Sequence, residues 1–118
     1  MTQVEFYENK LSFEIDAWDL NAARENGENI VVLDVRQEAT FNKCHIEGAV
    51  SFPHQGITAE NADKFDKNTQ YVTYCDGLGC NAATTGAMKL AKLGFNVREL
   101  IGGLTWWRDH SYPTVDNR

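Results

Sequence analysis

The chain has 118 residues, 42% of them hydrophobic, and a formal net charge of -6 at pH 7. This length and apolar content fit one compact core, so residues 1–118 are expected to form a single domain. Its eleven Lys and Arg residues are scattered and it has no run of 18 apolar residues, which excludes a nucleic-acid-binding surface and a membrane span.

The first half of the chain predicts alternating strands and helices. Residues Ile30–Val35 are apolar at all but one position, which is typical of a strand covered on both faces and favours a parallel sheet. Asp16 can cap a helix that Gly27 ends. In chain order we predict an edge strand near Lys10–Ile15, a helix from Asp16 through Asn26, the strand Ile30–Val35, a short helix around Gln37–Lys43, and a strand Ala49–Phe52 ended by Pro53.

The second half contains the clearest helix pattern. Four apolar residues within Asn81–Leu93 fall at positions i, i+4, i+7 and i+8, and Gly94 closes the helix. In chain order we predict a helical turn at Asn61–Phe65, a strand at Gln70–Tyr74, the helix Asn81–Leu93, a strand near Val97–Leu100, and a helix from Leu104 to His110. This alternation predicts an α/β fold with a central, mostly parallel sheet flanked by helices.

Cys75 directly follows the predicted strand Gln70–Tyr74, at the edge of a parallel sheet where ligands bind. Glycines in the loop after it can turn backbone N–H groups inward as an anion-binding nest, and the next helix adds its positive end. Both effects favour a thiolate and should lower the pKa of Cys75 toward neutrality. The sequence therefore predicts a reactive cysteine, and a cysteine that only fills the strand end is the alternative. The predicted substrate-binding loop is Asp76, Gly77, Leu78, Gly79, Cys80 and Asn81.

Two long segments resemble the single-domain rhodanese family of sulfurtransferases. VVLDVRQEATFNKCHIEGAVSFPH (31–54) has Asp-Val-Arg after a central strand and His-Ile-x-Gly-Ala before the next. The segment 71–115 is similar to the family's active-site strand, loop and helix, followed by Gly-Gly and an aromatic helix. The resemblance covers about residues 12–115 and implies the rhodanese-like three-layer α/β fold.

The resemblance also implies a reaction at Cys75. That residue would take a sulfane sulfur as a persulfide and pass it to a thiophilic acceptor. The partners expected are a small sulfur donor and a thiol or protein acceptor, and the chemistry requires neither a metal nor an organic cofactor.

Two loop positions depart from the family pattern, because Asp76 and Cys80 stand where common members carry arginine. A carboxylate beside the nucleophile should oppose thiolate formation and repel anionic donors, so weak use of thiosulfate is expected. Cys80 is either a resolving thiol that closes a disulfide with Cys75 or a small residue that fills the space of the arginine. Bridging requires the two Cα atoms to lie within about 7 Å.

Three function classes are compatible with these residues. A sulfurtransferase is favoured, and the main alternative is a non-catalytic or redox-sensing module in which Cys75 and Cys80 switch between dithiol and disulfide. A phosphatase or arsenate-reducing enzyme is disfavoured because such enzymes hold the oxyanion with a loop arginine. The residue six positions after Cys75 is Asn81.

The remaining polar candidates are interpreted as structural. Asp34 and Arg36 are expected to pair at the end of a central strand, because buried charges need partners. His45 is expected to be a hydrogen-bonded structural histidine, with a role as a base as the alternative. It adjoins Cys44, but no C-x-x-C spacing supports a metal site.

Two further features concern the tryptophans near the C-terminus and the expected cellular location. Trp106 and Trp107 are adjacent in a predicted helix and cannot share a face, so one should be core and the other can rim the cleft. The acidic N-terminal segment lacks the pattern of a signal peptide, and three cysteines suit a reducing compartment. A cytoplasmic location is therefore expected.

Overall fold

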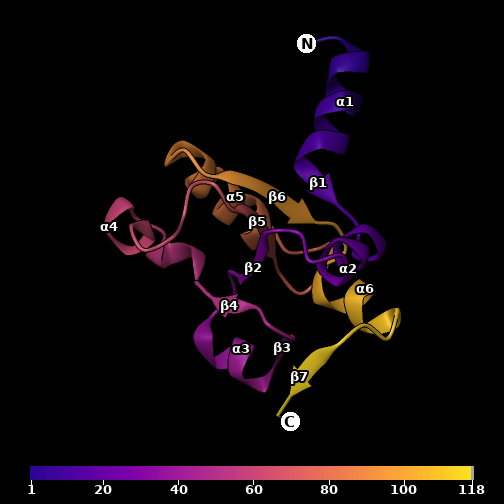
Figure 1. Cartoon of the computed structure of the whole chain (residues 1–118), viewed down its shortest axis with the longest axis vertical. Coiled ribbons are helices and arrows are strands. Elements are labelled where there is room, and N and C mark those ends of the chain that lie inside the picture. The colour runs from indigo at the N-terminus through magenta and orange to yellow at the C-terminus, as the bar shows by residue number, and fades with distance from the viewer. Residues whose placement is uncertain (118) are drawn as a thin grey trace.

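The computed structural model describes residues 1–117, and a five-stranded sheet in the order β1-β6-β5-β2-β4 forms its centre (Figure 1). All neighbouring strands of this sheet run parallel. The strands are β1 (Glu14–Ile15), β2 (Ile30–Asp34), β4 (Val50–Ser51), β5 (Gln70–Tyr74) and β6 (Asn96–Leu100). No helix within the described residues is long and apolar enough to cross a membrane.

Helices cover both faces of the sheet and bury two apolar clusters. The first cluster contains Val32 and Val72 from the central strands, packed with residues of α2 and α6. The second contains Leu33 and Tyr71 from the same strands, packed with residues of α4 and α5. The covering helices are α2 (Ala17–Glu25), α4 (Ala59–Ala62), α5 (Ala82–Lys92) and α6 (Gly103–Asp109). The predicted three-layer α/β fold is therefore confirmed, and the apolar strands are covered on both faces as their sequences indicated.

The N-terminal segment corrects one prediction. Residues 10–13, expected to be part of an edge strand, belong to helix α1 (Gln3–Phe13), and only β1 remains extended. The helix begins because Thr2 and Glu5 form a capping box, in which each side chain accepts a hydrogen bond from the other's backbone N–H. None of its residues is buried, and Figure 1 shows α1 projecting away from the sheet.

Several short elements also differ from the sequence prediction. Strands β3 (Cys44–Ile46) and β7 (Thr114–Asp116), which were not predicted, form a separate antiparallel pair. Helix α4 begins two residues earlier than the predicted turn because the Thr58 side chain accepts a hydrogen bond from Asn61 N–H. Helix α3 (Glu38–Lys43) lies within its predicted range, and η1 (His54–Gly56) is a short 3₁₀ turn.

Helix α5 is held close to the end of β2 by a glycine. Gly86 is buried on the side of α5 that faces Val35, the residue directly after β2. A Cβ atom placed on Gly86 would lie 2.9 Å from Val35 Cγ1, which is inside van der Waals contact. This close approach fixes α5, and with it the end of the Cys75 loop, against the central strands.

We predict that Gly86→Ala destabilises the protein by about 1–3 kcal/mol, because the added methyl group overpacks the contact with Val35. Helix propensity alone predicts the opposite sign, since alanine is favoured over glycine within a helix by roughly 0.5–1 kcal/mol. The free energy of unfolding would be measured by urea denaturation. Gly56→Ala is the control, because a Cβ there meets nothing closer than 4.0 Å. A stabilised Gly86→Ala protein would refute the close approach.

Candidate functional site

Cys75 lies immediately after β5, at the carboxyl edge of the sheet, and its side chain is buried. Its sulfur is bonded to that of Cys80 in a disulfide, with 6.3 Å between the two Cα atoms. The separation satisfies the distance that bridging requires, so Cys80 can reach Cys75. The loop therefore brings two sequence-predicted site residues into direct contact, while their chemical roles stay a prediction.

The start of α6 fixes the backbone at the beginning of the loop. Leu104 N–H donates to the Cys75 carbonyl at 2.9 Å, and Thr105 donates to the Asp76 carbonyl through its N–H at 2.9 Å and its hydroxyl at 2.8 Å. Gly103 has a φ of +56°, and a Cβ atom there would collide with the Cys75 carbonyl oxygen. Only glycine at this position allows α6 to approach the Cys75 backbone so closely. This explains why the Gly-Gly pair stands at the start of the helix.

The rest of the loop is exposed at Leu78, Gly79 and Asn81, half-buried at Gly77 and Cys80, and leads into the N-terminus of α5. Its backbone forms one turn, in which Cys80 N–H donates to the Gly77 carbonyl at 3.3 Å. Leu78 is 76% exposed. Asn81 precedes the helix without capping it through its side chain. The positive end of α5 is thus left open beside Cys80, as the sequence analysis expected.

A buried ion pair lies below the loop, at the end of β2. The Arg36 guanidinium donates to both carboxylate oxygens of Asp34, from Nε at 2.9 and 3.1 Å and from Nη2 at 2.6 Å. Nη2 also donates to the Cys44 carbonyl at 2.6 Å. Tyr74 donates its hydroxyl proton to Asp34 at 2.6 Å and accepts a hydrogen bond from Ile46 N–H at 3.0 Å. The ion pair expected from the sequence is present, with Asp34 fully buried.

This network shifts the pKa of two of its members. Burial alone would lower the pKa of Arg36, but the hydrogen bonds that it donates to Asp34 and Asp76 outweigh this effect and raise that pKa above its ordinary value. Burial and the adjacent Asp34 carboxylate raise the pKa of Tyr74 well above 10. Arg36 is therefore a permanent cation and Tyr74 a permanent hydrogen-bond donor at physiological pH.

Asp76 has a partner that the sequence analysis missed. Arg36 Nη1 donates to its carboxylate at 2.8 Å, although 67% of the Asp76 side chain is exposed. The sequence analysis considered this carboxylate as a charge beside the nucleophile and gave it no partner. In the structure, Arg36 neutralises part of that negative charge. No local sequence signal indicates this contact, because it depends on β2 and β5 being adjacent parallel strands whose carboxyl ends meet at one edge.

His45 lies apart from the loop. Its Nδ1 is 2.8 Å from the Phe41 carbonyl and its ring stacks on that of Phe41. The neighbouring Cys44 is a buried free thiol. Within residues 1–117, no group of three or more His, Cys, Asp or Glu side chains is arranged to hold a metal ion.

A pocket of about 180 Å³ opens over the disulfide. Lys10 and Glu14, which contribute to its wall, form an ion pair at 2.7 Å. The other walls come from the Cys75 loop, from the start of α5, and from residues 99–103 at the end of β6 and directly after it. The sequence analysis missed the walls from α1 and β6, because nothing in either segment's pattern indicates that it borders Cys75.

The two adjacent tryptophans of α6 separate as predicted. Trp107 is 1% exposed and its indole N–H donates to the Pro113 carbonyl, while Trp106 is 49% exposed.

Comparison with known proteins assigns the family. The Rhodanese-like domain family model matches residues 17–110. The crystal structure of BH2092 from Bacillus halodurans is 39% identical, with a TM-score of 0.90, covering 96% of this chain and 83% of that chain. The uncharacterized protein YibN of Escherichia coli is 34% identical over 92 residues, 76% of this chain and 64% of YibN. This chain thus spans slightly less than two thirds of that relative.

A more distant structure shows how widely the fold is shared. RPA3614 from Rhodopseudomonas palustris, described as a protein of unknown function and a possible tyrosine phosphatase, has a TM-score of 0.75 and 21% identity. The alignment covers 89% of this chain and 86% of RPA3614. At this identity the likeness shows the fold alone. The family match over most of the chain and the likeness to BH2092 go further, and from them we conclude that the chain belongs to the rhodanese-like domain family.

Proposed function

We propose that the protein is a sulfurtransferase that carries a sulfane sulfur on Cys75. One observation carries the proposal: Cys75 lies at the carboxyl edge of the sheet, under a pocket, in a loop that ends at a helix N-terminus without a side-chain cap. Such a setting favours a thiolate and offers hydrogen-bond donors to an anionic sulfur. The family assignment supports the same class of chemistry.

The proposed reaction begins from the reduced loop. The Cys75 thiolate attacks the outer sulfur of a donor, a new sulfur–sulfur bond forms, and the donor's own sulfur–sulfur bond breaks with its electron pair leaving on the donor. An acceptor thiolate then attacks the outer sulfur of the persulfide, and Cys75 leaves as a thiolate. We propose a small sulfur donor and a thiol or protein acceptor as partners, with Cys75 as the only covalent carrier.

Cys80 is proposed to resolve the persulfide. Its thiolate would attack Cys75 Sγ, form the Cys75–Cys80 disulfide and expel the outer sulfur as hydrosulfide. The disulfide geometry supports this step, since the two Cα atoms lie 6.3 Å apart. A dithiol reductant would then be needed to restore the reduced loop.

The same disulfide gives weaker support to a second candidate function. In that alternative the two thiols are a redox switch, and no sulfur is transferred. A phosphatase function has less support, because the candidate loop contains no arginine and Arg36 is engaged by Asp34 and Asp76.

We predict that the reduced wild-type protein gains one sulfur on incubation with a sulfane-sulfur donor and that Cys75→Ser abolishes this gain, because the serine hydroxyl cannot accept sulfane sulfur. Intact mass spectrometry measures the gain, and circular dichroism checks the fold. Loss of two hydrogens in the wild type, together with no gain of sulfur in Cys80→Ser, where the persulfide cannot be resolved, would instead favour the redox switch. Sulfur transfer by Cys75→Ser at the wild-type rate would refute the assignment.

We predict that Cys80→Ser keeps its extra sulfur at least severalfold longer than the wild type, because the resolving thiolate is absent. Both proteins would be loaded with persulfide and followed by mass spectrometry without reductant. Cys44→Ala, which removes the third cysteine, is the control and should decay as the wild type does. Equal lifetimes for all three proteins would leave Cys80 as a residue that only fills the loop.

A third prediction concerns Asp76 and anionic donors. Asp76→Asn removes one negative charge near Cys75 but keeps an oxygen for Arg36, so the KM for thiosulfate should fall by about two- to fivefold, the scale of a partly screened surface charge. The KM for an uncharged dialkyl trisulfide should stay constant, which makes it the internal control. If both donors respond equally, charge repulsion by Asp76 does not set donor preference.

A further inference from the structure

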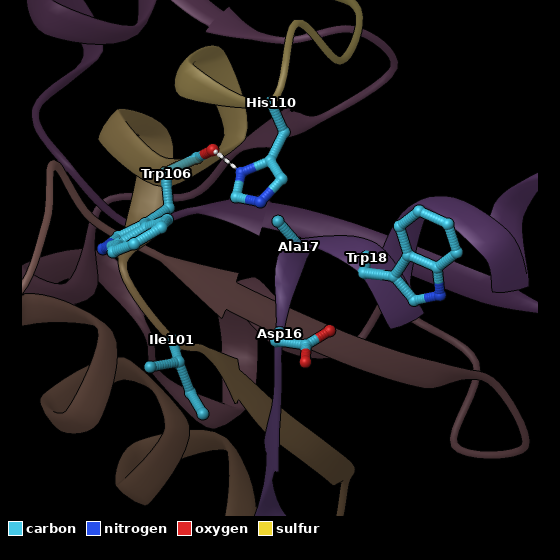
Figure 2. A pocket seen from close by; sticks show the side chains of 6 residues that line it. All are labelled: Asp16, Ala17, Trp18, Ile101, Trp106 and His110. Atoms are coloured by element: carbon cyan, nitrogen blue, oxygen red, sulfur yellow. Dashed lines mark hydrogen bonds between the residues drawn. The ribbon is translucent and has the colours of Figure 1, made fainter.

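A second depression lies beside the Cys75 pocket, and tryptophans line it. Its volume is about 270 Å³, and its lining residues are Asp16, Ala17, Trp18, Ile101, Trp106 and His110. Figure 2 shows the two indole rings on opposite sides of the depression, with His110 and Ala17 between them. Trp18 comes from the first turn of α2 and Trp106 from α6. Two elements far apart in sequence therefore build this site.

The exposure of these aromatic rings needs an explanation. Trp18 is 69% exposed, Trp106 is 49% exposed and Ile101 is 40% exposed. Tryptophan is enriched among the residues that dominate binding energy at protein interfaces, and contiguous exposed apolar surface marks sites of interaction. The core does not require these side chains, because Trp107 and Leu104 supply the buried face of α6.

The depression is fixed in position relative to Cys75. Ile101 lines both this depression and the Cys75 pocket, so the two are adjacent and share a wall. The same helix that carries Trp106 donates Leu104 N–H to the Cys75 carbonyl at 2.9 Å. Trp106 N–H donates to the Gly102 carbonyl at 3.2 Å, within the same turn. A molecule held by Trp106 would therefore be placed at a set distance from the sulfur.

The charge around this surface is mainly negative. A third depression, which also includes Ile101, extends the surface along α1 and adds Asp19 and Arg98 to its lining. The carboxylates lining the three depressions are Glu14, Asp16, Asp19 and Glu99, and the cationic side chains are Lys10 and Arg98. Lys10 is already paired with Glu14. The surplus of carboxylates favours a basic occupant.

We propose that this Trp18–Ile101–Trp106 surface docks the sulfur acceptor, and that the acceptor is a protein whose reactive cysteine lies in a segment with an apolar anchor and basic flanks. This inference rests on the proposed sulfurtransferase function, and it names the class of protein that accepts the sulfur. The anchor enters between the two tryptophans, and the basic flanks face the carboxylates. The cysteine then reaches the Cys75 persulfide by passing Ile101, which lines both depressions. A small thiol would need only the pocket over Cys75.

The test measures binding without sulfur chemistry. The probe is a fluorescently labelled, amidated pentapeptide, Lys-Leu-Ser-Trp-Lys, in which serine replaces the reactive cysteine, and its binding to the reduced wild-type chain is followed by anisotropy. We expect it to bind at least tenfold more tightly than Glu-Leu-Ser-Trp-Glu. We also expect Trp18→Ala and Trp106→Ala each to weaken its binding at least fivefold. Met88→Ala is the matched control, because Met88 is 47% exposed on α5, over the opposite face of the sheet, and should leave affinity unchanged.

Each outcome decides the proposal. Equal affinity for the two peptides, no binding of the basic peptide, or wild-type affinity in both tryptophan variants would overturn it. Circular dichroism of the two variants, which alter exposed side chains, confirms that they are folded. Failure of the docking surface and failure of sulfur transfer are distinguishable, because persulfide loading of the wild type by a small donor is measured by mass and involves no peptide.

Discussion

The arrangement of the site depends on one buried ion pair. Asp34 and Arg36 would be costly to bury alone, and the structure satisfies them with Tyr74, the Cys44 carbonyl and Asp76. These partners come from β5, from the start of β3 and from the Cys75 loop. The pair thus ties two central strands, a peripheral strand and the Cys75 loop to a single charged centre, which holds the start of that loop in place.

The central elements of the fold could be predicted from sequence because their signals are local. Strand β5 matches its prediction at both ends, and an apolar run such as β2 indicates a strand covered on both faces without knowledge of its neighbours. The edge strand predicted near Lys10–Ile15 was wrong over residues 10–13, since the capping box at Thr2 and Glu5 starts a helix that extends to Phe13. Strands β3 and β7 are short and exist because they pair with each other, which no local pattern reveals.

The candidate site, like the fold, has some features that local sequence predicts and others that depend on tertiary packing. Cys75 could be placed from sequence, because a strand, a glycine-containing loop and a helix follow one another along the chain. The contact between Arg36 and Asp76 could not, because it joins residues 40 positions apart and depends on which strands are neighbours. The tryptophan-lined depression was equally hidden. It requires α2 and α6 to meet on one face of the sheet, which follows only from the packing of the two helices.

The exposed loop after Cys75 has a consequence for how this architecture can change over time. Leu78 and Gly79 are exposed at the tip of the loop, whereas Asp76 is bonded to Arg36 and to α6, and Cys80 is bonded to Cys75. Substitutions or insertions at Leu78 and Gly79 therefore cost little stability, because they disturb no buried partner. Selection can therefore alter the tip of the loop, which borders the pocket over the disulfide, while the sheet and the buried ion pair stay unchanged.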